Sequence, residues 1–318
     1  MKEDFEIISI GVSSCLLGLE VRHDGSHKRN RFITDILSEH FDFVPFCPEM
    51  AIGLGTPRPA IRLIKKAGQV RLVDSKNSNN DYTELMQNTS AAYSKQLPDM
   101  SGYILKNKSP SCGMERVNLY NESGMPEKKG VGLFALQLMQ TNPNLPIEEE
   151  GRLHDAAMRE NFIERVYAYH RWQKMWQQGV TVASLMEFHK RHKLILLAHD
   201  EPAYRSLGKL VAASNKENLE DNAGQYISRF MQAMKKHSSR KKHVNVLQHS
   251  MGYLKKHLDT EDKDELLRVF EKYAKGEIPL IVPITLMKYH FRKNPHNYID
   301  DQLYMNPYPD NLMLRNHV

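Results

Sequence analysis

Three cysteines are the residues of this chain whose type and spacing could do chemistry together. Cys15, Cys47 and Cys112 each follow a strand-like run and lie in a short loop rich in Ser, Pro or Gly. No two of them form a close pair, so the spacing is not typical of a structural zinc site. Three thiolates from three loops can hold a metal cluster and leave one of its corners without a protein ligand. The alternative is three ordinary buried thiols.

Two oxygen-bearing side chains lie close to these cysteines in the sequence. Glu49 comes two residues after Cys47, and Ser109 comes three residues before Cys112. Beside a 4Fe-4S cluster with an open iron, Glu49 could serve as general base for a water and Ser109 could orient a substrate or relay a proton. Each also has a structural interpretation, the first in the initial turn of a helix and the second in a turn before proline.

Further polar residues near the same loops are candidates for lining a pocket. Ser14 and Ser111 are direct neighbours of cysteines, Asp24 lies in an Asp-Gly turn, and Arg58 is presented by a proline-rich loop. A plain turn is the default interpretation of the last two segments.

The first half of the chain alternates between strand and helix patterns. Strands are expected over residues 6–12, 41–46 and 101–105, two short strands about Ala67-Gly68 within 61–74, and helices over 31–40, 82–96 and from 132 onward. Such alternation is typical of an α/β, Rossmann-like fold with a mostly parallel sheet. The cysteines follow the carboxyl ends of strands, where such sheets collect their ligands. We therefore expect the three thiols at one rim.

The second half of the chain is predicted to be all-α. Proline and glutamate residues over 142–151 indicate a linker between domains 1–150 and 151–318. Four helices are expected. The first ends near residue 178, the second covers 181–199, the third begins at 200, and the fourth runs from 260 to 276.

Charge is distributed unevenly between the halves. Residues 1–151 carry 17 Lys and Arg against 19 Asp and Glu, a net of −2, whereas residues 152–318 carry 27 against 19, a net of +8. A basic domain suits a polyanion such as RNA, although a solubilised helical domain is an equally open interpretation. The candidate phosphate contacts are Arg191, Lys193, Lys209, Lys235, Lys236, Arg240, Lys241, Lys242, Lys255 and Lys256.

The expected environment is the cytoplasm, without a membrane partner. The charged first residues lack the apolar core of a signal peptide, and apolar runs are far shorter than a bilayer requires. In that compartment an odd number of cysteines favours thiols or metal ligation over a disulfide framework.

The motifs resemble those of a known family. SSCLLG, VRHDG, FCPE with GLGTPRP, and KSPSCG, within about residues 7–150, resemble TudS-type thiouracil desulfidases. HKLILLAH, LGKLVA, RKKHVNVLQHSMGYLKKHL, IPLIVPITLMKYH and PYPDNLMLRN, within about 160–318, resemble the YbgA-type helical domain. The two joined in one chain are similar to the tRNA 4-thiouridine desulfidases.

The resemblance implies roles for named residues. It implies that Cys15, Cys47 and Cys112 bind a 4Fe-4S cluster, that Glu49 activates water and that Ser109 assists, in a non-redox exchange of substrate sulfur for oxygen. The chain departs from the stand-alone family after the proline-arginine loop, where it has Ala60-Ile61-Arg62. Arg62 near the pocket would suit a nucleotide phosphate better than a free base.

The resulting hypothesis is an iron-sulfur desulfidase that converts 4-thiouridine in thiolated tRNA to uridine and sulfide. The base would leave its stack to reach the pocket. An aerobic preparation is expected to lose the cluster, and no obligate protein partner is evident. The alternatives are a desulfidase of free thiouracil or thionucleotides and a non-catalytic iron-sulfur sensor that binds RNA.

Overall fold

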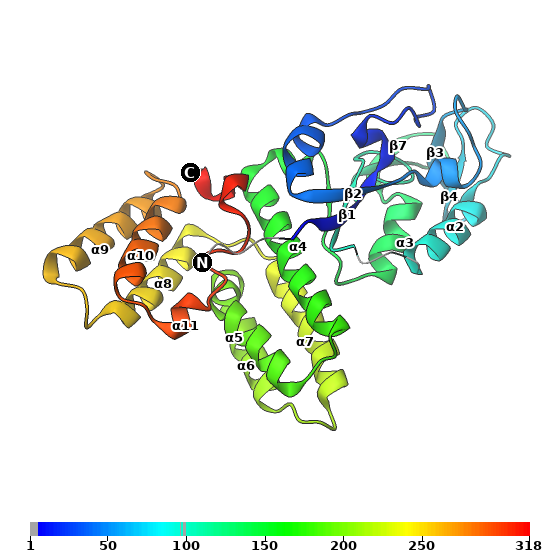
Figure 1. Cartoon of the computed structure of the whole chain (residues 1–318). Helices are drawn as coiled ribbons and strands as arrows, with labels where there is room; N and C mark the ends of the chain where they lie inside the picture. Colours follow the sequence, from blue (N-terminus) through cyan, green and yellow to red (C-terminus); the bar gives the residue numbers. More distant parts are fainter. Residues whose placement is uncertain (1–5, 96, 98–99) are drawn as a thin grey trace. The chain divides into compact units, whose positions relative to one another are not determined.

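The computed structural model describes residues 6–95, 97 and 100–318. The chain divides into two compact units, Met1–Asp155 and Ala156–Val318. The first combines strands with helices, and the second is built from helices (Figure 1). The predicted α/β region followed by a helical region is thus confirmed.

A parallel sheet forms the centre of the first unit. It comprises, in spatial order, β2 (Phe41–Phe46), β1 (Ile8–Ser13), β5 (Gly102–Leu105) and β8 (Ile147–Glu149). All three neighbouring pairs are parallel. In register, Ser13 lies opposite Phe46, so the carboxyl ends of β1 and β2 meet at one edge of the sheet. This edge is where the loops of Cys15 and Cys47 begin.

The strand β8 corrects the prediction of a linker over residues 142–151. Residues 147–149 complete the sheet beside β5, and Glu148, Glu149 and Glu150 are all buried. Their carboxylates are compensated inside the fold: Glu150 forms an ion pair with Lys106, and Glu149 accepts hydrogen bonds from backbone amides. A run of three acidic residues resembles a solvated linker in sequence, whereas here it is satisfied by tertiary partners.

A second, mixed sheet carries four further strands. Its spatial order is β4 (Gln69–Asp74), β3 (Ile61–Lys66), β6 (Val117–Tyr120) and β7 (Pro126–Gly130). The β3–β4 hairpin turns at Ala67 and Gly68, both with positive φ, of 50° and 79°. Such a turn joins tightly paired antiparallel strands, and the predicted pair of strands is confirmed.

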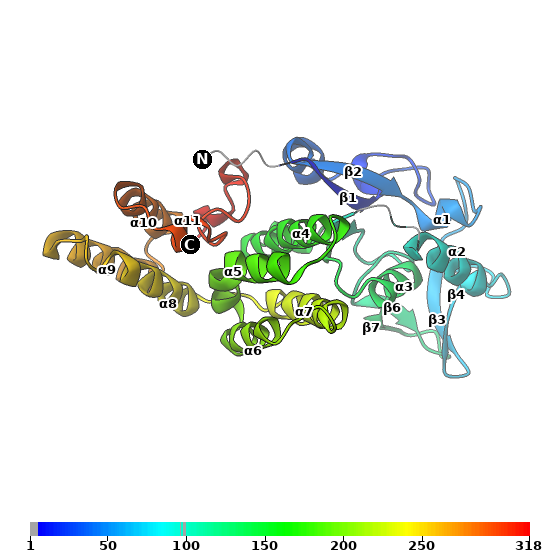
Figure 2. The same cartoon turned by 60° about the horizontal axis from the view of Figure 1, so that its bottom comes forward.

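Helices connect and cover these strands. The segment expected as a helix over 31–40 forms a π-turn and a 3₁₀ turn instead, and residue 96, the expected end of another helix, lies outside the described residues. Both views show α2 and α3 side by side (Figures 1 and 2). The helical elements are η1 (Ser14–Leu17), η2 (Phe32–Ile36), η3 (Leu37–Glu39), α1 (Pro48–Ala51), α2 (Thr83–Lys95), α3 (Leu133–Thr141) and η4 (Arg152–His154).

The second unit consists of longer helices. They are α4 (Ala156–Gln177), α5 (Val182–His199), α6 (Glu201–Ala212), α7 (Leu219–Met234), α8 (Arg240–Met251), η5 (Gly252–Leu254), α9 (Thr260–Lys275), α10 (Ile281–Lys293), α11 (Asn297–Asp300), η6 (Asp310–Leu312) and η7 (Leu314–Asn316). The predicted helix starts at Thr181 and near Thr260 agree with the caps, because Thr181 and Asp259 accept hydrogen bonds from amides of the first turn. No helix among the described residues is long and apolar enough to span a membrane.

An aromatic core holds the helices of the second unit together. Trp172, Phe188, Tyr226 and Phe230 contact one another, with ring centroids between 5.2 and 6.0 Å apart. Each is at most 6% exposed. Burial of such rings is a large favourable contribution to folding, so this unit has its own core.

Candidate functional site

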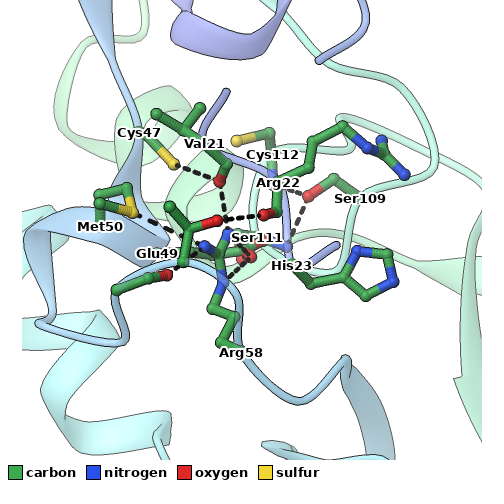
Figure 3. A network of polar contacts seen from close by, with 12 residues as sticks. Val21, Arg22, His23, Cys47, Glu49, Met50, Arg58, Ser109, Ser111 and Cys112 are labelled. Atoms are coloured by element: carbon green, nitrogen blue, oxygen red, sulfur yellow. Dashed lines mark hydrogen bonds and ion pairs between the residues drawn. The ribbon is translucent and has the colours of Figure 1, made fainter. Parts of the chain in front are cut away.

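A pocket at the carboxyl ends of β1, β2 and β5 gathers the predicted chemical residues. The pocket has a volume of about 350 Å³, and Cys15, Cys47, Cys112, Glu49 and Ser109 all line it. Figure 3 shows most of this group together with the polar network around it. Residues that are up to 97 positions apart in the sequence therefore share one cavity, as ligands do at such a sheet edge.

Each cysteine is held by its own local structure. Cys15 lies in η1 directly after β1, and its carbonyl accepts a hydrogen bond from the Lys28 amide at 2.8 Å. Cys47 caps the N-terminus of α1, and its thiol donates to the Val21 carbonyl at 3.9 Å. The Ser109 hydroxyl oxygen accepts hydrogen bonds from the amides of Ser111 and Cys112, at 3.2 and 3.1 Å, which closes the turn at Cys112.

The Cys112 loop is docked on the start of α3. The Gly132 amide donates to the Gly113 carbonyl at 2.8 Å, and the Ala135 amide donates to the Ser111 carbonyl at 3.1 Å. A Cβ on Gly132 would lie 2.4 Å from the Ser111 carbonyl oxygen, so a glycine is required for this approach. The first amides of α3 thus hold the Cys112 loop in place.

The surroundings of the three thiols disfavour the thiolate form. Burial raises the pKa of Cys15 to about 11, with the Lys106 charge opposing it, and burial also raises the pKa of Cys47 and of Cys112, the last far above its usual range. Deprotonation therefore requires a compensating cation, which a bound metal group provides. Among the described residues no cluster of His, Cys, Asp and Glu lies close enough to hold one metal ion.

Glu49 is fixed by two partners. The Arg58 guanidinium donates to Glu49 Oε2 from Nη2 at 2.6 Å and from Nε at 3.1 Å, while the Ser111 hydroxyl donates to Oε1 at 2.9 Å. The glutamate side chain is 15% exposed and that of Arg58 is 2% exposed. Oε1 retains a lone pair beyond its single donor, so the carboxylate can still receive a proton from a molecule in the pocket.

Arg58 joins the loops around Glu49, which makes it important for stability. Its guanidinium also donates to the Val21 and Gly55 carbonyls, at 2.8 and 2.6 Å. Arg58→Met is expected to lower the free energy of unfolding by about 3 to 5 kcal/mol, because it leaves the Glu49 carboxylate without its cation and removes the arginine donors of two carbonyls. Urea denaturation of the full chain measures this loss.

The matched control for that variant is Arg71→Met. Arg71 is 40% exposed and lies 3.8 Å from Asp81, so its loss should cost less than about 1 kcal/mol. Equal losses in the two variants would contradict the structural role given to Arg58.

The structure brings some of the other pocket candidates together and not others. Ser14 and Arg58 line the pocket, and Ser111 contacts Glu49 from outside the lining. Asp24 is exposed and binds Ser26. Arg62 is also outside the lining, because successive strand residues point to opposite faces: its neighbour Ile61 faces the pocket, and the Arg62 guanidinium lies 5.1 Å from the centre of the Tyr120 ring.

The sequence analysis did not identify Glu149, at the end of β8, and Glu150, which follows it, as residues that hold the pocket loops. Glu150 Oε2 accepts a hydrogen bond from the Asn107 amide at 2.7 Å and its other oxygen pairs with Lys106; both partners line the pocket. Glu149 accepts from the Met114 amide at 2.6 Å, just beyond Cys112. The only signal in the sequence was that an acidic run, residues 148–150, could pair with Lys106 in an earlier loop. The interpretation of the acidic run as a linker left this pairing unconsidered.

The ten basic candidates of the second unit have mixed environments. Lys236 pairs with Asp200 at 2.5 Å, and Lys242 donates to the His199 carbonyl at 2.6 Å. Burial lowers the pKa of Lys235. Arg191 and Lys193 are half-buried in α5. The exposed members are Lys209, Lys235, Lys236, Arg240, Lys241, Lys255 and Lys256.

The protein combines two units. The first is an α/β unit with a cavity lined by three thiols and a carboxylate, and the second is helical. Residues 10–150 match the model of the 2-thiouracil desulfurase family, and residues 193–309 match a family described as a protein of unknown function, DUF1722. The chain therefore consists of a domain of the 2-thiouracil desulfurase family followed by a YbgA-type domain.

Two curated relatives agree with this assignment, each over one half of the chain. The uncharacterized protein YbgA of Escherichia coli K12 is 32% identical over 152 residues, which cover 48% of this chain and 90% of YbgA. The uncharacterized protein YbbK of Bacillus subtilis 168 is 35% identical over 149 residues, which cover 44% of this chain and 95% of YbbK. A solved structure titled [4Fe-4S]-dependent thiouracil desulfidase TudS is 29% identical and covers 46% of this chain and 93% of its own, with a TM-score of 0.37.

Proposed function

We propose that this protein is an iron-sulfur-dependent, non-redox desulfidase that acts on 4-thiouridine in tRNA and releases uridine and sulfide. The observation that carries the proposal is the convergence of three thiols, a fixed carboxylate and a serine hydroxyl on one pocket of about 350 Å³. Membership of the 2-thiouracil desulfurase family supports the reaction class. The tRNA substrate rests on the basic second half and on cations of the pocket.

The donor set fits a 4Fe-4S cluster held at three corners. Cys15, Cys47 and Cys112 are the chain's only cysteines, and all three line the pocket. A cluster spreads its ligands farther apart than a single ion does, which is consistent with three thiols sharing a cavity without forming a single-ion site. When bound, the cluster would supply one open iron, a soft Lewis acid for the substrate's sulfur.

Glu49 is placed to accept the proton of an attacking water. Its carboxylate is held by Arg58 and Ser111, which fixes the direction of Oε1 before substrate arrives. In the exchange a C–O bond forms at C4 of the base and the C–S bond breaks, and the water's protons end on Glu49 and on the departing sulfide. No oxidant or reductant is needed.

Ser109 is placed to donate a hydrogen bond to the substrate. Its oxygen already accepts from two backbone amides, so the hydroxyl proton is the part of the group that is left for another partner. Because those amides belong to the Cys112 turn, the same contact sets the position of a cysteine and of the hydroxyl. Ser109 therefore assists both binding and proton transfer.

Cations on the pocket favour a nucleotide over a free base. Arg22, Lys28 and Lys108 line it in addition to the paired Lys106 and Arg58. Lys28 and Lys108 are exposed, as residues that meet a flanking phosphate would be. In this proposal Lys28 and Lys108 contact the nucleotide phosphate, the role that was predicted for Arg62 from the sequence. The net charge of +8 over residues 152–318 adds an attraction for a polyanion.

A double variant separates the tRNA substrate from free thiobases. Protein reconstituted without oxygen should convert 4-thiouridine in tRNA to uridine, detected by nucleoside mass spectrometry. Lys28→Gln with Lys108→Gln is expected to lower kcat/KM for tRNA by about tenfold and to leave turnover of free 4-thiouracil unchanged, because only the polyanion contacts these charges.

The control for the double variant removes two lysines away from the pocket. Lys128→Gln with Lys129→Gln alters two exposed residues of β7 and should leave both activities intact. Turnover of free thiobase with no preference for tRNA would favour the alternative of a thiobase desulfidase. Unchanged 4-thiouridine with a fully loaded cluster would contradict the proposal and favour a non-catalytic sensor.

A further inference from the structure

The second unit contains a cavity that the proposed desulfidation does not use. Its volume is about 260 Å³, and its lining comes from α4, the end of α5, α8, α9, the segment before α8, Leu280 and the residues after η7. Figure 1 shows the labelled helices within this unit. Glu160, Glu164, His199, Arg240 and Tyr273 are among the lining residues. A cavity lined by so many ionisable groups in a helical unit requires an explanation in terms of a ligand.

The two glutamates at its wall, Glu160 and Glu164, already have protein partners. Glu164 Oε2 contacts His199 Nε2 at 2.8 Å, and Glu160 Oε1 accepts from the Tyr308 hydroxyl at 2.8 Å. The buried Arg315 guanidinium lies between the two carboxylates, 3.3 Å from Glu160 and 3.7 Å from Glu164. Burial opposes ionisation of Glu164, yet the His199 hydrogen bond and the nearby cations lower its pKa.

Several donors of the cavity have no protein partner among the residues that the structure describes. Arg240 is exposed, and its guanidinium packs against Gly276 at the C-terminal end of α9 without a hydrogen bond or ion pair to another described residue. Tyr273 is only 6% exposed, and its hydroxyl has no hydrogen-bond partner in that part of the chain. The Ser238 hydroxyl oxygen is buried and likewise unpaired. A buried hydroxyl without a partner, as at Ser238, is costly unless a ligand or water satisfies it, and the Tyr273 hydroxyl is open to the cavity.

His243 adds a fourth donor. Its Nδ1 lies 2.8 Å from the Tyr304 hydroxyl, which has no other acceptor among the described residues. Burial lowers the pKa of His243 to about 3, so the ring is neutral and carries one proton. In the tautomer in which the Tyr304 hydroxyl donates to Nδ1, the ring proton lies on Nε2, which has no hydrogen-bond partner among the described residues.

The same cavity lies at the N-terminus of α8, a helix of 12 residues. Arg240, Lys241 and Lys242 form its first turn, which contains no acidic residue. Cations at a helix N-terminus are unfavourable because they face the positive end of the helix dipole. An anion bound beside Arg240 would relieve that repulsion and would meet the free donors at the same time.

We propose that this cavity is a binding site for a phosphate monoester, held by Ser238, Arg240, His243 and Tyr273. Four donors match the three terminal oxygens of a monoester better than the two oxygens of a phosphodiester within a strand. The group can come from a free nucleotide or from the 5′ end of an RNA. A metal ion is not favoured, because the described residues include no metal-ligating cluster.

Equilibrium binding to the full chain tests the site with inorganic phosphate, UMP and uridine as probes. Phosphate and UMP should bind and uridine should not. Arg240→Gln is expected to weaken UMP binding about 10- to 100-fold, and Tyr273→Phe about 3- to 10-fold, from the loss of one charged and one neutral hydrogen bond. Thermal unfolding of each variant checks that it is folded.

Lys272→Gln is the matched control. It removes one exposed charge from the residue next to Tyr273 in α9 and does not touch the cavity, so UMP affinity should stay within about twofold. RNAs that differ only in a 5′-phosphate or 5′-hydroxyl distinguish the source. A preference for the phosphorylated end that Arg240→Gln removes identifies RNA, whereas UMP binding without that preference identifies a free nucleotide.

Two outcomes would overturn this site. One is the absence of saturable binding of phosphate, UMP and 5′-phosphorylated RNA to the folded protein. The other is an equal loss of UMP affinity in Arg240→Gln and Lys272→Gln, which would show general attraction by charge. Neither outcome bears on the desulfidation chemistry, which rests on residues of the first unit and is measured with free 4-thiouracil.

Discussion

Replacing Glu49 by glutamine is expected to lower the rate of sulfide release by about 100- to 10,000-fold, the range typical of a lost general base. The amide cannot take a proton from water, yet it keeps the size of the side chain. Because the three cysteines are unchanged, iron and sulfide content should equal those of the wild type. Sulfide release and metal content measured on the same oxygen-free samples check both statements.

The variant also carries a cost in stability that must be measured separately. Arg58 would lose the charge that compensates its buried guanidinium, so the free energy of unfolding should fall by up to about 3 kcal/mol. Glu115→Gln is the matched control: this carboxylate is 46% exposed and pairs with Arg152 at 2.8 Å, outside the pocket. It should change stability by less than about 1 kcal/mol and leave activity intact. Sulfide release by Glu49→Gln at the wild-type rate would remove the glutamate from the reaction.

Serine in place of any one of the three cysteines is expected to reduce bound iron and sulfide by about tenfold or more and to abolish turnover, since each thiolate holds one corner of the same group. The size of the effect should be the same for Cys15, Cys47 and Cys112. Iron and acid-labile sulfide analysis after anaerobic reconstitution measures it.

The alternative of three packing thiols predicts a different order. Cys112 is 6% exposed and Cys15 is 9% exposed, whereas Cys47 is less buried. If the thiols only filled space, Cys112→Ser would destabilise the fold most, Cys47→Ser would be nearly neutral, and iron content would not respond to any of them. That pattern would contradict a shared cluster.

Local signals in the sequence predicted much of the framework. The Ala67-Gly68 pair marked the β3–β4 turn because a left-handed backbone favours glycine, and the limits of both strands follow from it. Thr181 marked the start of α5 through its side-chain oxygen. The rim position of Cys15 and Cys47 followed from strand order alone, since both come directly after parallel neighbours.

Features that depend on distant partners could not be predicted. β8 escaped detection because Glu149 and Glu150 are buried only by virtue of loop amides and a lysine that lie far earlier in the chain. Arg62 was placed in the pocket by proximity to Arg58, whereas strand parity turns it away. The ion pair between Arg58 and Glu49 joins a loop to the first turn of α1, and the spacing of the two residues in the sequence does not predict this contact.

Isotope labelling of the product tests the central claim most directly. Cluster-loaded protein would be mixed with 4-thiouridine-containing tRNA in ¹⁸O-water, without oxygen and without added oxidant or reductant, and the nucleosides would be analysed by mass spectrometry together with released sulfide. We expect uridine that carries ¹⁸O at C4 and an equal amount of sulfide. Unlabelled uridine, or 4-thiouridine that remains unchanged in the presence of an intact cluster, would contradict it.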